Sequence, residues 1–168
     1  MRKKLLIFGA GQYGILTKEI ALETGNYQQI DFLDDNNETA IGKLEDYLSF
    51  LGQYEEAIVA IGNSEIRREW LEKIDKTGSE IATVISPKAH VSSTAKIEKG
   101  CIIEAFANVQ TATVVEQGTI VCSNSVLGHN SQVGEVCHID IGAVVPPRAK
   151  VLNGTKVLAG TVYNEKDR

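Results

Sequence analysis

The second half of the chain follows a hydrophobic pattern with a period of six residues. From Ile85 to Val162 the unit repeats thirteen times, with an aliphatic residue always first and a small residue always fifth. This period is neither the 3.6 of an α-helix nor the 2 of a half-buried strand, so the repeat itself is the structural unit. Three units make one triangular coil with the aliphatic residues inside, which predicts a parallel β-helix over residues 85–162.

The first half alternates short apolar runs with amphipathic segments. We expect strands at residues 3–9, 29–33, 56–61 and 80–85, and helices at 12–24, 43–51 and 64–76. This alternation predicts a small Rossmann-like α/β domain at residues 1–84, with a parallel sheet and crossover helices. Because a solenoid must cover its ends, we expect this domain to cap the N-terminal end of the β-helix. Residues 163–168 are expected to form a polar C-terminal tail.

Composition excludes several classes of function. The net charge is −5 with a pI near 5.2, and no basic block is present to contact nucleic-acid phosphates. The apolar run after the first residues is too short for a signal peptide or a membrane span, so we expect a cytoplasmic protein without membrane contact. Cys101, Cys122 and Cys137 form no CxxC pair, and we expect reduced packing residues and no metal site.

A glycine motif follows the first predicted strand. Gly9, Gly11 and Gly14 form GxGxxG at the start of a helix, and Asp34 follows the second strand. Three interpretations remain open: a dinucleotide site for NAD, a site for a nucleotide or nucleotide-sugar, and a purely structural turn. The domain is too small for the full dinucleotide fold, which disfavours NAD. The loops at 9–14, 34–36 and 62–67 should share one rim of the sheet, which favours a ligand.

Two histidines fall in one coil of the predicted β-helix. His129 occupies a third position and His138 a sixth, both outside the prism core. An imidazole has an ordinary pKa of about 6.5 and can act as a general base, so His129 is either a catalytic base or an ordinary surface histidine. His90 lies in the first coil, far along the axis, and we interpret it as a surface histidine.

Four stretches resemble the bacterial sugar acyltransferases of the NeuD and PglD kind. They are LLIFGAGQYG (5–14), IDFLDD (30–35), AIVAIGNSEIRR (57–68) and SVLGHNSQVGEVCHIDIGAVV (125–145), in family order over nearly the whole chain. The resemblance implies a left-handed β-helix and a homotrimer with sites between adjacent prisms. It also implies acetyl transfer from acetyl-CoA to an amino or hydroxyl group of a nucleotide-linked sugar, often a UDP-linked amino-sugar, in glycan or polysaccharide biosynthesis.

The resemblance also implies roles for individual residues. His129 matches the catalytic base, and Asn130 stands where relatives carry an acid that orients it. His138 matches a histidine near the acetyl end of CoA, and Gly142 and Ala143 lie in the same cofactor-binding segment. The expected substrate-binding residues are Gly9, Gly11, Gln12, Tyr13, Asp34, Asp35, Gly62, Asn63 and Arg67.

Three departures from the family pattern keep an alternative open. Asn130 supplies no compensating charge to the base. Gln12 and Tyr13 replace the Gly and His that relatives tend to have in the first loop. Pro146 and Pro147 stand beside the expected CoA arm, and relatives continue for further coils beyond this sequence. The alternative is a non-catalytic nucleotide-sugar-binding or scaffold relative with reduced CoA binding.

Apolar residues at outward positions suggest a surface for self-association. Val126, Val144 and Val162 recur at steps of eighteen and should stack on one face. Further outward apolar residues are Phe106, Val114 and Ile120. Cyclic symmetry closes such contacts, so we expect part of a trimer interface here.

Overall fold

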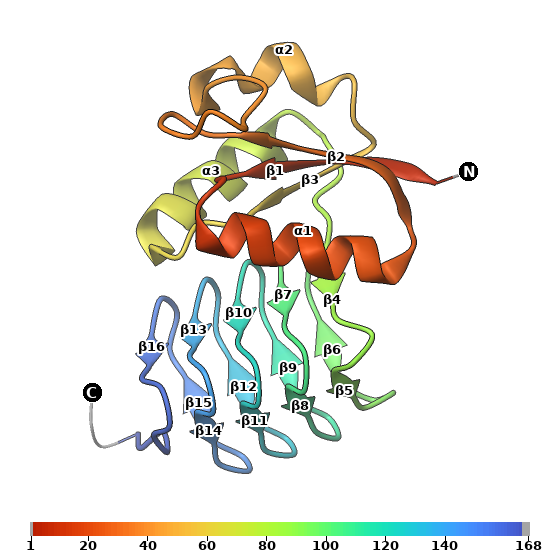
Figure 1. The fold of residues 1–168 in the computed structure, drawn as a ribbon. Coiled ribbons are helices and arrows are strands. Elements are labelled where there is room, and N and C mark those ends of the chain that lie inside the picture. Colours follow the sequence, from red (N-terminus) through yellow and green to blue (C-terminus); the bar gives the residue numbers. More distant parts are fainter. Residues whose placement is uncertain (1, 166–168) are drawn as a thin grey trace.

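The computed structural model describes residues 2–165, which form an α/β domain and a parallel β-helix (Figure 1). The sheet of the α/β domain has the order β2-β1-β3 with all strands parallel, which confirms the predicted architecture. In chain order, this domain comprises β1 (Lys3–Phe8), α1 (Gln12–Thr24), β2 (Tyr27–Leu33), the 3-10 turn η1 (Leu44–Asp46), α2 (Tyr47–Leu51), β3 (Glu56–Val59) and α3 (Ser64–Lys76).

Helix α3 illustrates how local sequence fixes an element. It begins after Asn63, whose side-chain oxygen accepts hydrogen bonds from the N–H groups of Glu65 and Ile66, both at 3.0 Å. Such a cap satisfies donors that the first helical turn leaves free. The helix buries Leu71 and Ile74 on its inner face. Its predicted bounds, 64–76, are those observed.

Two predicted elements differ from the structure. The helix expected at 43–51 is a 3-10 turn followed by a five-residue helix, and it starts at Leu44. The strand expected at 80–85 is divided between the two domains. Ile81 forms a parallel bridge with Ala57 at the edge of the α/β sheet, and the chain then enters β4, which pairs within the β-helix.

The strands of the β-helix are two residues long and form three parallel sheets, which we call faces 1, 2 and 3. Paired residues such as Ile120 and His138 are eighteen apart, so three hexads make one coil, as predicted. Face 1 contains β4 (Val84–Ile85), β7 (Ile102–Ile103), β10 (Ile120–Val121), β13 (His138–Ile139) and β16 (Lys156–Val157). Face 2 contains β5 (His90–Val91), β8 (Asn108–Val109), β11 (Val126–Leu127) and β14 (Val144–Val145). Face 3 contains β6 (Lys96–Ile97), β9 (Val114–Val115), β12 (Gln132–Val133) and β15 (Lys150–Val151).

The first and fifth residues of the hexad fill the prism, as predicted. From Val109 to Val151 the first residues are at most 1% exposed. Each such burial stabilises the fold by roughly 1.5–3 kcal/mol before conformational entropy is counted. Two of the small polar residues inside are hydrogen-bonded: the hydroxyl of Thr113 donates to the carbonyl of Gly128, and that of Thr119 donates to the carbonyl of Gly134. The buried hydroxyl of Ser131 has no hydrogen-bond partner within residues 2–165.

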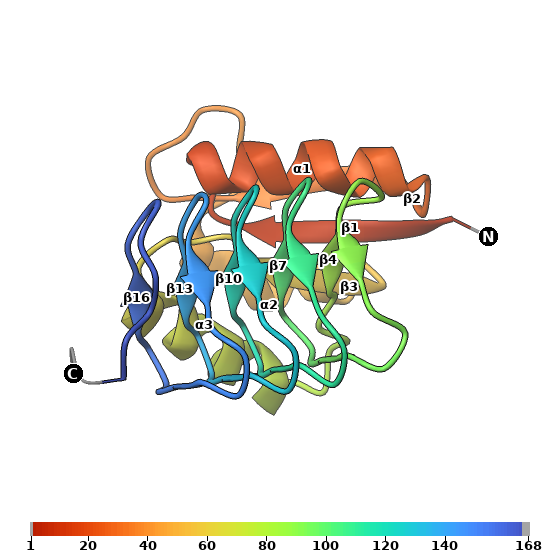
Figure 2. The same ribbon diagram turned by 90° about the horizontal axis from the view of Figure 1, so that it is seen from below.

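The α/β domain lies along the side of the β-helix, so the prediction that it caps the N-terminal end is wrong. Helix α1 runs parallel to the stack of coils, over the row of face 1 strands (Figures 1 and 2). Ile102 and Ile120 of face 1 are 1% and 0% exposed and belong to the same apolar cluster as Ile20 of α1. Ile120 is therefore covered within the chain, which corrects its assignment to the outward apolar surface.

Residues 162–165 pack on the last coils. Val162 forms a bridge with Val144, and the Tyr163 hydroxyl donates to the Lys150 carbonyl at 3.0 Å. The Lys150 N–H donates to Glu165 Oε1 at 2.8 Å. The rest of the predicted tail, residues 166–168, lies outside the described residues. None of the helices within residues 2–165 combines the length and apolar character that crossing a bilayer requires.

Candidate functional site

A pocket of about 510 Å³ opens at the carboxyl ends of the strands in the α/β domain. All the predicted substrate-binding residues except Asn63 and Arg67 line it. The loops at 9–14, 34–35 and 60–62 thus meet at one rim, as the strand order requires. The lining residues are Gly9, Gly11, Gln12, Tyr13, Asp34, Asp35, Leu44, Ala60, Ile61, Gly62, Ile66, Glu69 and Trp70.

The N-terminus of α1 is free to meet an anion in this pocket. Its N-cap is Gly11, no side chain caps it, and its first turn contains no acidic residue. A Cβ built on Gly11 would meet no atom within 4 Å, so the backbone is open to a ligand there. Gly14 instead serves packing, because a Cβ there would lie 2.0 Å from the Gly9 carbonyl oxygen. This geometry suits a phosphate group on helical N–H donors.

Asp34 and Asp35 shape the opposite wall of the pocket. The two carboxylate oxygens of Asp34 accept hydrogen bonds from the N–H groups of Ala10 (2.7 Å) and Asn36 (2.9 Å). Asp35 accepts one from the N–H of Leu44 at 3.0 Å. Each carboxylate therefore holds a loop in place and keeps accepting capacity that ligand hydroxyl groups can use.

Helix α3 supplies pocket residues that the sequence analysis missed. Ile66, Glu69 and Trp70 line the pocket, and the Trp70 ring packs edge-to-face on Tyr47, with centroids 5.5 Å apart. The Lys73 ammonium lies 4.2 Å from the centre of the Trp70 ring. The i, i+3 and i, i+4 spacing of 66, 69, 70 and 73 was the available signal, because it places these residues on one helical face.

Arg67 and Asn63 do not line this pocket. Asn63 is the N-cap of α3. Arg67 is 0% exposed, and all five of its N–H donors are bonded to backbone carbonyls, so no donor remains for a substrate. The prediction that Arg67 binds substrate is therefore wrong. Its side chain instead joins the α/β domain to the β-helix.

Tyr13 closes the pocket on the side of the β-helix. Its hydroxyl lies 3.0 Å from Nε2 of His138, and Cys122 Sγ lies 3.4 Å from the same nitrogen. His138 is 4% exposed, so it lies outside the prism as predicted but beneath the α/β domain. Burial lowers the pKa of His138 and raises the pKa of Tyr13 to about 12. At neutral pH the imidazole is therefore neutral, and its Nε2 shares a hydrogen bond with the Tyr13 hydroxyl.

Donor atoms of Cys122, His138 and Asp140 lie within 4.8 Å of one another. The sequence analysis did not identify this cluster, although the eighteen-residue spacing of Cys122 and Asp140 was the available signal, because residues one coil apart stack. Burial raises the pKa of the Cys122 thiol, and the Asp140 carboxylate is paired with the Lys156 ammonium at 3.1 Å. Because Lys156 pairs with the Asp140 carboxylate and burial keeps the Cys122 thiol protonated, we assign no metal to this cluster.

His129 lines a groove of about 480 Å³ at the corner between faces 2 and 3. The backbone N–H of His129 donates to Gln110 Oε1 at 3.0 Å. Asn108 also lines the groove. Its Oδ1 atom is buried and has no hydrogen-bond partner within residues 2–165. His90 also lines this groove, contrary to the expected separation from His129.

Asn130 orients the His129 ring. Its Nδ2 lies 3.0 Å from Nδ1 of His129 and donates to it, which places the proton of the neutral ring on Nε2. A half-turn of the amide presents Oδ1 to Nδ1–H instead and leaves Nε2 free to accept a proton. Asn130 therefore positions the ring without fixing the tautomer that a general base needs.

The two prolines pack directly beside the candidate base. A Cβ on Gly128 would lie 2.5 Å from the nitrogen of Pro147, so the preceding coil requires glycine there. The Arg148 N–H donates to the His129 carbonyl at 3.0 Å. Pro146 and Pro147 thus form a wall next to His129.

The segment expected to bind the cofactor offers few free groups. Ala143 is 0% exposed with its side chain in the prism core, its N–H donates to the Asp140 carbonyl, and its carbonyl accepts from the Val126 N–H. The cofactor contact expected of Ala143 therefore has no free group. Gly142 is half-buried at a corner, with its N–H bonded to the Ser123 carbonyl.

The pocket and the His129 groove lie on different sides of the chain. The α/β domain covers face 1, whereas His129 lies at the corner where faces 2 and 3 meet. In a triangular prism that corner is opposite face 1. One copy of the chain therefore does not bring its own pocket and its own His129 together.

Comparisons with known proteins extend this picture. A sequence model of the PglD N-terminal domain family matches residues 4–74. The acetyltransferase domain of PglB from Neisseria gonorrhoeae FA1090, solved with acetyl coenzyme A, is 30% identical, with a TM-score of 0.84. That match covers 98% of this chain and 92% of the other. PerB from Caulobacter crescentus, solved with CoA and GDP-perosamine, is 22% identical, with a TM-score of 0.76 and coverage of 96% and 88%. At this low identity, the match to PerB shows a shared fold and nothing more.

Proposed function

Because the chain belongs to the PglD-type family of bacterial sugar acyltransferases, we propose that it transfers an acetyl group from acetyl-CoA to a nucleotide-linked amino sugar for glycan biosynthesis. The fold is that of the family: a small parallel α/β domain followed by a left-handed parallel β-helix. The match to an acetyl-CoA-bound acetyltransferase domain over nearly the full length of both chains is the observation that carries this proposal.

The pocket of the α/β domain is proposed to hold the nucleotide-sugar. The open N–H groups at Gly11 suit its diphosphate, and Asp34 and Asp35 can accept hydrogen bonds from hydroxyl or base N–H groups. Trp70 offers an apolar ring to a base or sugar face. UDP- and GDP-linked sugars share this chemistry, so the base is a question for experiment.

His129 is proposed to act as the general base. The amino group of the sugar attacks the thioester carbonyl carbon of acetyl-CoA, and Nε2 of His129 accepts the proton that the amine loses. The tetrahedral intermediate then expels the CoA sulfur, which takes that proton from the imidazolium. The products are the N-acetyl sugar and CoA thiol, and the base is regenerated. This route requires the amide of Asn130 to present Oδ1 to the ring.

His138 is proposed to contact the acetyl end of CoA. Its Nε2 atom is covered by the Tyr13 hydroxyl, so this contact requires Tyr13 to move aside. The low pKa of His138 keeps it neutral, which lets it accept or donate one hydrogen bond without adding charge.

A homotrimer is proposed to complete the site. Within one chain the pocket and His129 are on opposite sides, so a neighbouring copy must supply the second half. Val126, Val144 and Val162 stack along face 2, as predicted, and the exposed Phe106 lies at a corner of the same prism. This apolar face suits contact with a second prism.

Thermal-shift measurements test the ligands proposed here. A ligand that binds only the folded state raises the melting temperature, by several degrees at concentrations far above its Kd. We expect shifts with UDP- or GDP-linked amino sugars and with acetyl-CoA, and none with NAD. A shift with the nucleotide-sugar but none with acetyl-CoA would favour the non-catalytic alternative. A shift with NAD alone would contradict the assignment of the pocket.

A further inference from the structure

Arg67 is the largest fully buried side chain of the molecule within residues 2–165. None of the ion pairs in that range includes it, and burial lowers its pKa to about 10, so it remains charged at neutral pH. A buried charge without a carboxylate partner is costly unless every donor is hydrogen-bonded. Here that condition is met by five backbone carbonyls alone.

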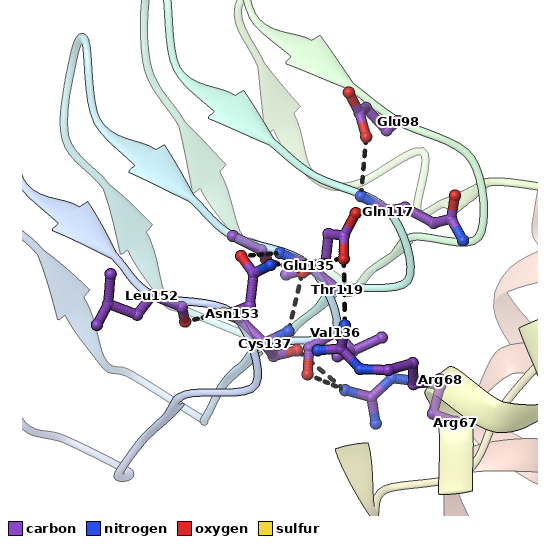
Figure 3. Close-up of polar contacts among 11 residues, drawn as sticks. Arg67, Arg68, Glu98, Gln117, Thr119, Glu135, Val136, Cys137, Leu152 and Asn153 are labelled. Carbon is purple, nitrogen blue, oxygen red and sulfur yellow. Dashed lines mark hydrogen bonds and ion pairs between the residues drawn. The ribbon is translucent and has the colours of Figure 1, made fainter. Parts of the chain in front are cut away.

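These carbonyls come from the two domains. Nη1 donates to Ile61 (2.7 Å) and Gly62 (3.0 Å), in the loop that forms the pocket wall. Nε donates to Gly118 at 2.7 Å, and Nη2 donates to Val136 (2.7 Å) and Cys137 (3.1 Å), at the corner between faces 3 and 1. Figure 3 shows Arg67 reaching from α3 to Val136 and Cys137. The guanidinium therefore joins the pocket loop to two successive coils.

The corner that Arg67 holds is strained at one residue. Gly100, Gly118 and Gly154 occupy this corner in the other coils, each with a positive φ between 69° and 76°. Val136 takes the corresponding place with φ 46°, in a region that β-branched residues rarely adopt. Its side chain is 2% exposed and packs in the same cluster as Leu71 of α3. Arg67 bonds to the carbonyl of this strained residue.

The strained corner leads directly to His138. Val136 and Cys137 immediately precede it in the chain. The Gly62 backbone packs on the Tyr13 ring, since a Cβ on Gly62 would lie 3.0 Å from that ring, and the Tyr13 hydroxyl lies 3.0 Å from Nε2 of His138. Arg67 thus bonds to the residue that directly precedes His138 and to Gly62, on which the His138 partner Tyr13 packs. No other side chain in the described range is shown to bond to both segments.

We propose that Arg67 is a positioning residue that sets the orientation of His138 and the shape of the pocket wall together, through its bonds to Gly62, Val136 and Cys137. The importance of this for acetyl transfer rests on the function proposed above. The positioning itself does not, because it concerns bonds within the chain.

The test compares Arg67→Met, Arg67→Lys and the matched control Arg68→Met. Arg68 is the adjacent arginine, and it pairs with Glu135 on the surface. The first readout is the ¹⁵N NMR signature of the His138 ring, assigned with a His138→Gln variant, which requires no substrate. We expect the His138 ring signals to change in both Arg67 variants relative to the parent protein, and to stay unchanged in the control.

The second readout is the affinity for the nucleotide-sugar, measured by calorimetry. Because small misplacements of binding groups are costly, we expect a loss of at least about tenfold in the Arg67 variants. If Arg67→Met does not fold, Arg67→Lys decides, since it keeps the charge but cannot span five carbonyls. Unchanged His138 ring signals in the folded Arg67 variant would overturn the proposal. Parent protein that binds no nucleotide-sugar would contradict the proposed function, and the ring signals would still decide the role of Arg67.

Discussion

At the scale of single residues, the partner of His129 sets the limit on its chemistry. An aspartate at position 130 would accept a hydrogen bond from Nδ1–H and stabilise the imidazolium that forms when Nε2 takes a proton. Asn130 does neither in the arrangement observed, because its Nδ2 donates to Nδ1. The proposed base therefore works only for the fraction of time in which the amide is turned.

The first prediction concerns Asn130→Asp. Both asparagine and aspartate tolerate the left-handed backbone observed here, at φ 60°, so the fold should persist. We expect kcat/KM for acetyl transfer at neutral pH to rise by about tenfold or more. Asn124→Asp is the matched control, because Asn124 has φ 59° at another corner, and no histidine within residues 2–165 is shown bonded to it. An unchanged rate in Asn130→Asp would argue against His129 as the base.

The second prediction concerns the buried His138. Burial, the largest cause, lowers its folded-state pKa below the ordinary value of about 6.5, so the unfolded chain binds more protons between these two values. The free energy of unfolding is therefore highest with respect to this group above about pH 6.5. It falls as the pH drops below that value, by at most about 1.4 kcal/mol per pH unit.

Urea unfolding between pH 5 and pH 8 measures this effect. We expect His138→Gln to flatten the acid side of the stability profile relative to the parent protein. His90→Gln, which alters an exposed histidine, should leave the profile unchanged. Equal pH slopes in the parent and His138→Gln proteins would show that burial does not hold the ring neutral.

At the scale of elements, the six-residue period predicted the β-helix because each hexad is a complete structural unit whose inward residue is set by local pattern. The GxGxxG loop was predictable for the same reason. The docking of the α/β domain was not, since it depends on the fit between surfaces from distant segments. Ile102 and Ile120, one coil apart on face 1, were the available signal, and Ile120 was instead assigned to an outward surface.

Helix α1 carries the third prediction, a matched pair of glycine substitutions. Gly14→Ala places a Cβ against the Gly9 backbone and should destabilise the fold by at least about 2 kcal/mol. Gly11→Ala meets no atom within 4 Å and should cost less than about 1 kcal/mol as an N-cap change. It should nevertheless weaken nucleotide-sugar binding. Denaturation and calorimetry of both variants measure these effects, and intact binding by Gly11→Ala would place the ligand elsewhere.

The roles of Arg67 and His138 show where prediction from one sequence stops. Arg67 follows the pocket loop in the chain, as a substrate-binding arginine would. Its five carbonyl partners lie up to seventy residues from it in the chain, so only the folded chain distinguishes a positioning residue from a ligand-binding residue. His138 was placed outside the prism by its hexad position, and its burial followed from the unpredicted position of the α/β domain.

At the scale of the whole molecule, the arrangement of the two half-sites is the main consequence of the fold. The α/β domain covers face 1, and His129 lies at the opposite corner. Acetyl transfer with His129 as base therefore requires that one copy present its pocket to the His129 groove of another. The apolar stripe on face 2 is the proposed contact.

The most direct measurement is acetyl transfer by two variants, separately and mixed. Product is detected by mass spectrometry, as the nucleotide-linked amino sugar that has gained one acetyl group from acetyl-CoA. His129→Ala removes the base, and Gly11→Val fills the phosphate site of the pocket. Each variant alone should lose at least about 100-fold in rate.

After the two variants are unfolded and refolded together, about one quarter of the parent activity should return. In that mixture, an intact pocket meets an intact His129 in ~1/4 of randomly assembled sites. Parent-like transfer by His129→Ala alone would remove that residue from the mechanism. Two inactive variants that stay inactive when mixed would contradict a site shared between copies of the chain.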